Sequence, residues 1–212
     1  MSVTAKRLGR QERREQTRAD LLAAARRAFL RDGLHGASLD AIAEDAGYTK
    51  GAFYSNFASK DEAMIAVFEE HFRDRAAAYE RMIFTTDSVD DAYRAVARYW
   101  HDANEREPEW SRLVIEFMAH ASRHEHLRQA VKEVRQRGLD RIAALIEQLA
   151  ERHGVEYTVP IAEVARGSGA LNRGLAVEQL LDPELSVEAF EEMHVAYVRG
   201  LTKQRKETEG QS

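Results

Sequence analysis

Apolar residues recur every three or four positions along most of the chain, which is the spacing of amphipathic helices. The first helix is expected over residues 11–32 and to end at Gly33, and its apolar face consists of Leu21, Ala24, Ala25, Ala28 and Phe29. Strands would show a two-residue alternation, which the sequence lacks, so an all-α fold is predicted. Residues 155–159 are expected to be an irregular connection and the tail from Lys203 to be frayed. Further helices are expected to begin near Ser59, Ser88, Pro108, Leu127, Pro160 and Ser186.

Two short helical segments flank Gly47. Ser38 is suited to cap the first segment and Thr49 the second. Gly47 permits the sharp turn between them, because only glycine adopts positive φ without a Cβ penalty. This is the layout of a helix-turn-helix, in which the second helix enters the DNA major groove. Phe53 and Phe57 lie four residues apart and are expected to anchor that helix in a small core.

Tyr54 and Lys60 are candidates for contacts with DNA phosphates. Tyr54 is turned to a different face from the aromatic anchor, so its hydroxyl can reach a phosphate; a core tyrosine is the alternative. Lys60 lies at the start of the next helix, where the helix dipole disfavours a cation. A bound phosphate would relieve that conflict, and a solvated lysine is the alternative.

Charge is unevenly distributed along the 212 residues, whose net charge is −5. Residues 1–60 contain 11 Lys and Arg against 7 Asp and Glu, whereas the remainder contains 20 against 29. This asymmetry suggests a small DNA-facing domain and a larger, acidic domain that faces elsewhere. The basic arm, residues 1–10, is expected to be disordered in the free protein and able to follow phosphates or enter a minor groove.

Composition excludes several classes of protein. Hydrophobic residues make up 44% of the chain, which is enough for a core, and the absence of cysteine excludes disulfides and thiolate metal sites. No apolar run reaches the roughly 18 residues of a membrane span, and no signal-peptide core is present, so a cytoplasmic protein without membrane association is expected. An all-helical enzyme is an alternative of a different class. The sequence contains no phosphate loop, nucleophile elbow or acid–base pair to support it, so no enzymatic activity and no cofactor are predicted.

Several short motifs in the first third of the chain carry a family resemblance. They are the helix end at Phe29–Gly33, SLDAIA at 38–43, AG at 46–47, TKGAFYSNF at 49–57 and SKDE at 59–62. Together they resemble the tetracycline-repressor (TetR) family of bacterial transcription regulators. The rest of the chain agrees with that family only as a series of helices. Ala63 departs from the larger apolar residue that is common there, which affects local packing.

The resemblance implies about nine helices and a homodimer whose two recognition helices enter successive major grooves of a double-stranded operator. The domains are then 1–58 for DNA binding, 59–206 for effector binding and dimerisation, and a tail at 207–212. The residues implied at the DNA are Ser38, Thr49, Lys50, Gly51, Tyr54, Ser55, Asn56 and Lys60. Lys50 is the best candidate for reading a base, since lysine can donate to guanine O6 and N7. Gly51 would let the backbone approach DNA closely.

The resemblance also implies that a small molecule binds inside the larger domain and changes the separation of the two DNA-binding units. A repressor released from a palindromic operator is then the expected function, and a constitutive DNA-binding protein without an effector is the alternative. Candidate lining residues are Tyr93, Trp100, Trp110, Phe117, Met118, His120 and Asn172. Their aromatic members fit an ordinary helical core equally well. An effector that binds there is expected to be partly apolar or aromatic.

Glu116, His120 and His124 repeat at four-residue spacing, which can place metal ligands on one helical face. The order of a helical zinc motif is absent, so solvated or hydrogen-bonded histidines are expected and no metal site is predicted.

The last two helices are expected to form the dimer interface. Their apolar periodicity and small residues suit a four-helix contact between two chains. The residues expected there are Gly169, Leu171, Leu175, Ala176, Phe190, Met193 and Tyr197. Gly167 and Gly169 fit either close helix packing or a kink.

Overall fold

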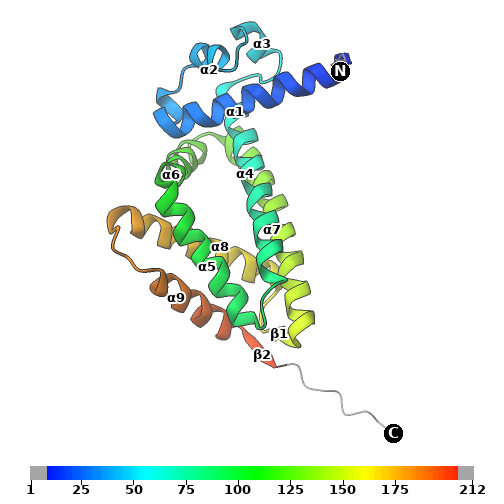
Figure 1. The fold of residues 1–212 in the computed structure, drawn as a ribbon, viewed down its shortest axis with the longest axis vertical. Coiled ribbons are helices and arrows are strands. Elements are labelled where there is room, and N and C mark those ends of the chain that lie inside the picture. Colours follow the sequence, from blue (N-terminus) through cyan, green and yellow to red (C-terminus); the bar gives the residue numbers. More distant parts are fainter. Residues whose placement is uncertain (1–8, 205–212) are drawn as a thin grey trace, which may run out of the picture. The chain divides into compact units, whose positions relative to one another are not determined.

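The computed structural model describes residues 9–204 and confirms the all-α class, with nine helices in this range (Figure 1). The helices are α1 (Arg10–Gly36), α2 (Leu39–Asp45), α3 (Lys50–Tyr54), α4 (Lys60–Ile83), α5 (Val89–Arg106), α6 (Pro108–Ser122), α7 (Glu125–His153), α8 (Ile161–Leu181) and α9 (Val187–Arg199). Each expected helix begins within two residues of its predicted position. Most of the basic arm and the tail at 207–212 lie outside the described residues. None of the helices in the described part combines the length and hydropathy that a membrane span requires.

The chain forms two compact units. The first comprises residues up to Glu70 together with Leu113–Arg128, and the second comprises His71–Arg112 together with the chain from Gln129 onward. Helices α4, α6 and α7 therefore contribute residues to both units. The predicted DNA-binding domain falls within the first unit, which also takes in the start of α4 and part of α6.

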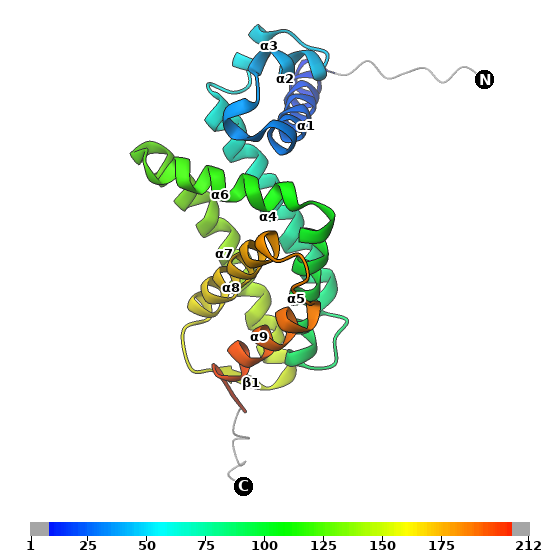
Figure 2. The ribbon, with the colours of Figure 1, turned by 90° about the vertical axis from the view of Figure 1, so that its left-hand side faces the viewer.

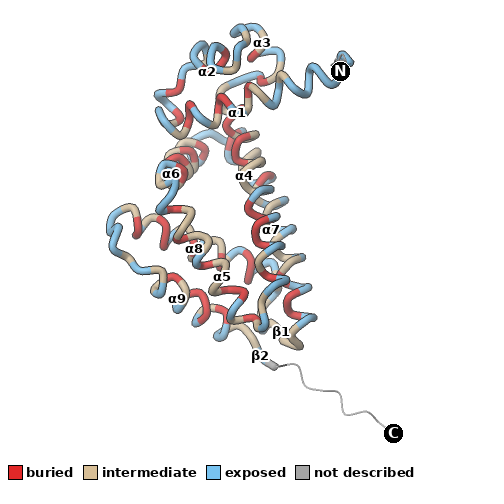
Figure 3. Tube along the Cα trace, viewed as in Figure 1, coloured by how far each residue is buried: buried red, intermediate tan, exposed pale blue. Residues whose placement is uncertain are grey.

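The predicted apolar face of α1 forms part of the core of the first unit. Leu21 and Phe29 are fully buried, together with Ile42 of α2 and Phe53 of α3. Figure 3 shows buried stretches, in red, along α1. Ala63 at the start of α4 is fully buried as well, so a small residue fits this position.

The first regular helix of α1 ends at Gly33, as predicted, and a kink there separates it from a short helical segment. The φ of Gly33 is 73°, a left-handed value that favours glycine, and helical structure resumes as far as Gly36. The Glu116 carboxylate accepts hydrogen bonds from the backbone N–H groups of Leu34 (3.0 Å) and His35 (3.2 Å). A Cβ at Gly33 would lie 2.8 Å from that carboxylate, so the contact also requires glycine.

Most of the expected helix caps are present. Thr49, Ser88 and Ser186 each accept a hydrogen bond from a backbone N–H in the first turn of the following helix. Ser59 accepts one from the N–H of Glu62 at 3.0 Å. Ser38 occupies the N-cap position of α2, but its hydroxyl accepts no capping bond, so the predicted side-chain cap is wrong there.

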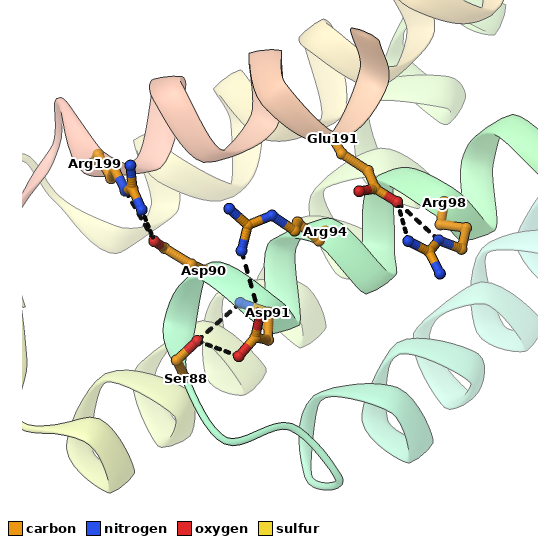
Figure 4. A network of polar contacts seen from close by, with 7 residues as sticks. All are labelled: Ser88, Asp90, Asp91, Arg94, Arg98, Glu191 and Arg199. Carbon is orange, nitrogen blue, oxygen red and sulfur yellow. Dashed lines mark hydrogen bonds and ion pairs between the residues drawn. The ribbon is translucent and has the colours of Figure 1, made fainter. Parts of the chain in front are cut away.

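Helices α5 and α9 pack side by side in the second unit (Figures 1 and 2). Phe190 of α9 is fully buried in a cluster with Ala97 of α5 and Leu175 of α8. Two ion pairs flank this contact: Arg98 with Glu191, and Arg199 with Asp90 (Figure 4). Because the residue numbers run in opposite directions across these pairs, the two helices are antiparallel.

A two-stranded antiparallel sheet in the second unit corrects the expectation that the protein has no strands. β1 (Val155–Tyr157) pairs with β2 (Thr202–Gln204), so that Val155 lies opposite Gln204 and Tyr157 opposite Thr202. Residues 155–157 are therefore not irregular, and Lys203 and Gln204 belong to a strand rather than to a frayed tail. Three-residue strands show too little alternation to be recognised, and their pairing depends on a partner far along the chain.

Candidate nucleic-acid interface

The helix-turn-helix consists of α2, a turn at Gly47 and α3. Gly47 has a φ of 76°, as the turn requires. The Thr49 hydroxyl accepts a hydrogen bond from the N–H of Ala52 (3.2 Å) and so fixes the start of α3. Phe53 and Phe57 are both buried, and their ring centroids lie 5.4 Å apart. The predicted aromatic anchor is therefore confirmed.

Anchoring by Phe53 turns the opposite face of α3 outward. Lys50, Gly51, Tyr54 and Ser55 are all exposed. The Tyr54 side chain is 50% exposed and meets Phe53 edge-on, which excludes the alternative of a core tyrosine. A short helix with an exposed lysine, glycine and tyrosine on one face can approach the edges of bases and a phosphate at the same time.

Lys50 has an acidic partner, Asp40, ten positions earlier in the chain. Its Nζ lies 2.9 Å from the Asp40 carboxylate of α2, and this hydrogen bond raises the pKa of Lys50. Both side chains are exposed, so solvent screens their attraction. The exposure of both side chains means that separating this pair costs little free energy.

The side chains of Ser55 and Asn56 bond to the backbone of α3. The Ser55 hydroxyl donates to the Gly51 carbonyl (2.9 Å), and the Asn56 amide donates to the Ala52 carbonyl (2.8 Å). Ser55 remains exposed, whereas Asn56 is partly buried. These bonds give both residues a role in closing the helix end.

The Lys60 ammonium bonds to the chain between α1 and α2. It donates to the carbonyl oxygens of His35 and Ala37, each at 3.2 Å. These two oxygens offset the unfavourable helix dipole, so a phosphate is not needed to explain a lysine at this position.

Arg18 of α1 holds the segment that follows α3. Its guanidinium donates to the carbonyl oxygen of Asn56 and lies 4.2 Å from the centroid of the Phe57 ring. The Tyr48 hydroxyl similarly donates to the Asp20 carboxylate of α1 at 2.9 Å. Neither contact has a local sequence signal, because each joins residues that are far apart in the chain.

The seven residues predicted to line an effector site belong to both units. Tyr93, Trp100, Trp110 and Asn172 lie in the second unit, and Phe117, Met118 and His120 lie in the first. Phe117 is buried and stacks on Phe68 with ring centroids 5.0 Å apart. This contact fits the alternative prediction, that Phe117 is an ordinary core residue. No single unit therefore contains the whole predicted set.

The histidine-rich segment of α6 makes polar contacts within the first unit. His120 Nε2 lies 3.4 Å from the Asp61 carboxylate, and its ring meets His35 edge-on. The Glu116 carboxylate is used by the two backbone N–H groups beyond Gly33. These contacts explain Glu116 and His120 without a metal.

Three of the residues expected at the dimer interface are buried inside the protomer. Leu175, Ala176 and Phe190 are buried against other residues of the second unit in their own chain. Met193 is 47% exposed and remains accessible. The close approach of α8 to α9 occurs at Gly167, where a Cβ would collide with the Tyr197 hydroxyl; α8 continues through Gly167 and Gly169 as one helix.

Family models match both halves of the chain. Residues 21–67 match the tetR family of bacterial regulatory proteins, and residues 89–203 match the C-terminal domain of BetI-type transcriptional repressors. The second match alone covers more than half of the chain. The chain belongs to the tetR family of bacterial regulatory proteins.

Curated relatives share sequence over part of their length. The transcriptional activator FasR of Mycolicibacterium smegmatis is 32% identical over 103 residues, which cover 49% of this chain and 47% of FasR. The transcriptional regulator UidR of Escherichia coli K12 is 27% identical over 118 residues, or 56% of this chain and 58% of UidR. The matched stretch thus spans about half the length of these relatives, all of which are named as regulators of transcription rather than enzymes.

Solved structures share the fold over nearly their whole length. A TetR-family regulator from Rhodococcus sp. superposes with a TM-score of 0.71 at 23% identity, covering 88% of this chain and 98% of that one. FadR of Bacillus subtilis, solved in complex with stearoyl-CoA, gives a TM-score of 0.67 at 15% identity, with 86% and 98% coverage. At these identities the likeness establishes the common helical architecture.

Proposed function

We propose that this chain is a DNA-binding regulator of transcription, and that α3 is its recognition helix. The observation that carries the proposal is the exposed face of Lys50, Gly51 and Tyr54 on a helix anchored from behind by Phe53. Membership of the tetR family supports it independently. Residues 1–58 would form the DNA-binding domain and residues 59–206 the effector-binding and dimerisation domain.

In the proposed complex, α3 enters the major groove and Lys50 exchanges Asp40 for a guanine edge. Gly51 supports close approach to DNA, because nothing in the protein itself requires glycine there. Its nearest neighbour to an added Cβ is the Thr49 hydroxyl at 3.7 Å, an ordinary contact distance. Tyr54 and Ser55, also exposed, are placed to reach phosphates, and Ser38 and Thr49 precede the two helices of the motif.

The regulator would act as a homodimer in the cytoplasm on a palindromic operator. The proposed interface consists of exposed residues of α8 and α9. Met193 and Leu181 are among them. A two-fold dimer would place its recognition helices about 34–36 Å apart, which is one turn of DNA.

A small molecule would control the affinity for DNA. The match to BetI-type repressors over residues 89–203 favours repression as the mode of regulation. FadR, which has the same fold, was solved with stearoyl-CoA, so this architecture can hold a small-molecule ligand. Repression would then be relieved when the effector stabilises a conformation with lower DNA affinity.

The test is a genome-wide selection of DNA fragments bound by the purified protein. The expected result is a two-fold symmetric motif whose half-site centres lie about 10 base pairs, or a multiple, apart. Binding to random fragments with no enriched motif at roughly 0.15 M salt would contradict sequence-specific recognition.

A further inference from the structure

Arg75 of α4 is a buried cation in the second unit. Its residue surface is only 8% exposed, and its Nε is buried without a hydrogen-bond partner. The guanidinium carbon lies 3.5 Å from the centroid of the Trp100 ring of α5. None of the ion pairs among residues 9–204 includes Arg75, so no carboxylate of the described chain neutralises it.

Two further arginines add positive charge to this region. Arg173 of α8 is partly buried, and desolvation lowers its pKa to about 10, with repulsion from Arg135 of α7 and from Arg75 acting in the same direction. Burial likewise lowers the pKa of Arg75. No ion pair in the described part of the chain involves Arg135 or Arg173 either. Helices α4, α7 and α8 thus each contribute a guanidinium group to this region, and those of Arg75 and Arg135 both repel that of Arg173.

This arrangement is unfavourable for a protein without a ligand. A buried charge is costly unless it is paired and hydrogen-bonded, and like charges increase the cost. Stacking on Trp100 offsets part of the cost for Arg75 but does nothing for the repulsion that Arg173 experiences. An anion from solution would neutralise the group, and the planar guanidinium matches both carboxylate and phosphate oxygens.

The side chains around Arg75 indicate that the anion would also have an apolar part. Trp100 lies against one face of the guanidinium, and Tyr79 is buried nearby with its ring edge-on to Tyr99. Burial raises the pKa of Tyr79 to about 12, so its hydroxyl stays neutral and can donate a hydrogen bond. Aromatic surface beside a cationic group suits a molecule with an apolar body and one anionic end.

We propose that Arg75, Arg173 and Arg135 bind the charged group of an amphipathic organic anion, with Trp100 and Tyr79 contacting its apolar part. The proposal rests on the proposed function, because it assigns the chemical class of the effector. Carboxylate and phosphate share the chemistry that this cluster recognises.

The first test measures binding to the full-length wild-type protein by isothermal titration calorimetry. The probes are octanoate and octyl phosphate, with octanol and octyltrimethylammonium as neutral and cationic controls of equal chain length. The expected result is saturable binding of at least one anion and none of the controls, and comparing the two anions distinguishes a carboxylate from a phosphate effector. Failure of both anions to bind, or equal binding of octanol, overturns the proposal.

The second test uses Arg75→Gln and Arg173→Gln, which remove the positive charge and leave a shorter polar side chain. Each is expected to weaken anion binding roughly 10- to 100-fold, since a hydrogen-bonded charge is lost. Arg166→Gln is the matched control, because Arg166 is an exposed arginine of α8 that pairs with Glu163 one helical turn earlier. This variant should leave the anion affinity unchanged. Unchanged affinity in both test variants overturns the assignment.

Thermal unfolding without ligand separates an anion site from a purely structural role. If Arg75 serves to bind an anion, Arg75→Gln removes an uncompensated buried charge from the ligand-free protein. The thermal unfolding midpoint should then stay the same or rise. A lower midpoint together with full anion affinity would make Arg75 a structural residue and overturn the proposal. Operator binding by the wild-type protein, measured without any anion, tests the proposed function separately, so either idea can fail while the other stands.

Discussion

Two lysines of the first unit and one arginine of the second unit are held in opposite ways. In the first unit, Lys50 and Lys60 each donate to oxygen atoms of the same unit while remaining in contact with solvent. In the second unit, Arg75 is buried with an aromatic ring but without an anion. Exposed pairs are weak and are easily separated, which suits the surface that we propose binds DNA. A buried cation without a carboxylate partner is instead unfavourable, and the proposed anion would compensate for it.

Removing the anchor of the recognition helix should have the largest effect on the first half of this comparison. Phe53→Ala deletes a fully buried ring, and about 3–5 kcal/mol of unfolding free energy should be lost in urea denaturation. Operator binding should fall with it, because α3 loses its support. Tyr54→Ala is the control on the exposed face, and its stability should change by no more than about 0.5 kcal/mol. Equal destabilisation by the two variants would show that α3 is not anchored as described.

Lys50→Ala tests whether the exposed lysine reads sequence. Discrimination at one operator base pair should fall by about tenfold or more, while affinity for random DNA changes little, because a base contact is lost rather than a phosphate contact. Competition binding with singly substituted operators measures the effect. A loss of affinity that is equal for operator and random DNA would reassign Lys50 to the phosphates.

Gly51→Ala distinguishes a requirement of the DNA complex from a requirement of the fold. The free protein should be unchanged or more stable by up to about 1 kcal/mol, because alanine favours helix and the site has room for a Cβ. DNA affinity should nevertheless fall, because the added methyl group separates the backbone from the groove. The experiment pairs thermal unfolding with operator titration, and unchanged DNA affinity would place Gly51 away from the DNA.

Asp40→Asn should have the smallest effect and bears directly on how easily the exposed pairs are exchanged. Without the carboxylate, Lys50 is free before DNA arrives, so operator affinity should rise severalfold at most. Asp45→Asn is the matched control, since Asp45 pairs with Arg27 instead of Lys50. This variant should not increase the operator affinity. A 100-fold increase in operator affinity would mean that the exposed Lys50–Asp40 pair is a strong interaction. The difference drawn between the exposed lysines and the buried Arg75 would then not hold.

The helix-turn-helix was predictable because its signals are local. A cap such as Thr49 and the turn glycine Gly47 act over three or four residues, and the structure shows both in the expected roles. Residues that share a helical face, such as Phe53 and Phe57, follow from the 3.6-residue period alone. The outward direction of Tyr54 follows from the same geometry.

The partners of the functional residues were not predictable in this way. Asp40 lies ten positions from Lys50, and the carbonyls that bind Lys60 lie more than 20 positions away. The same limit affected the interface prediction, since periodicity identifies Phe190 as apolar but does not say whether its own chain or a partner covers it. Short strands such as β1 and β2 are decided only by their pairing.

The sequence by itself determined the class of fold, the positions of the helices and the helix-turn-helix, because periodicity, caps and positive-φ glycines act within a few residues. The tertiary structure alone decided which oxygens hold Lys50 and Lys60, and which apolar side chains are covered within the protomer. It also brought Arg75, Arg135 and Arg173 together from three helices. Side-chain electrostatics depend on distances that packing sets, and no local pattern records them.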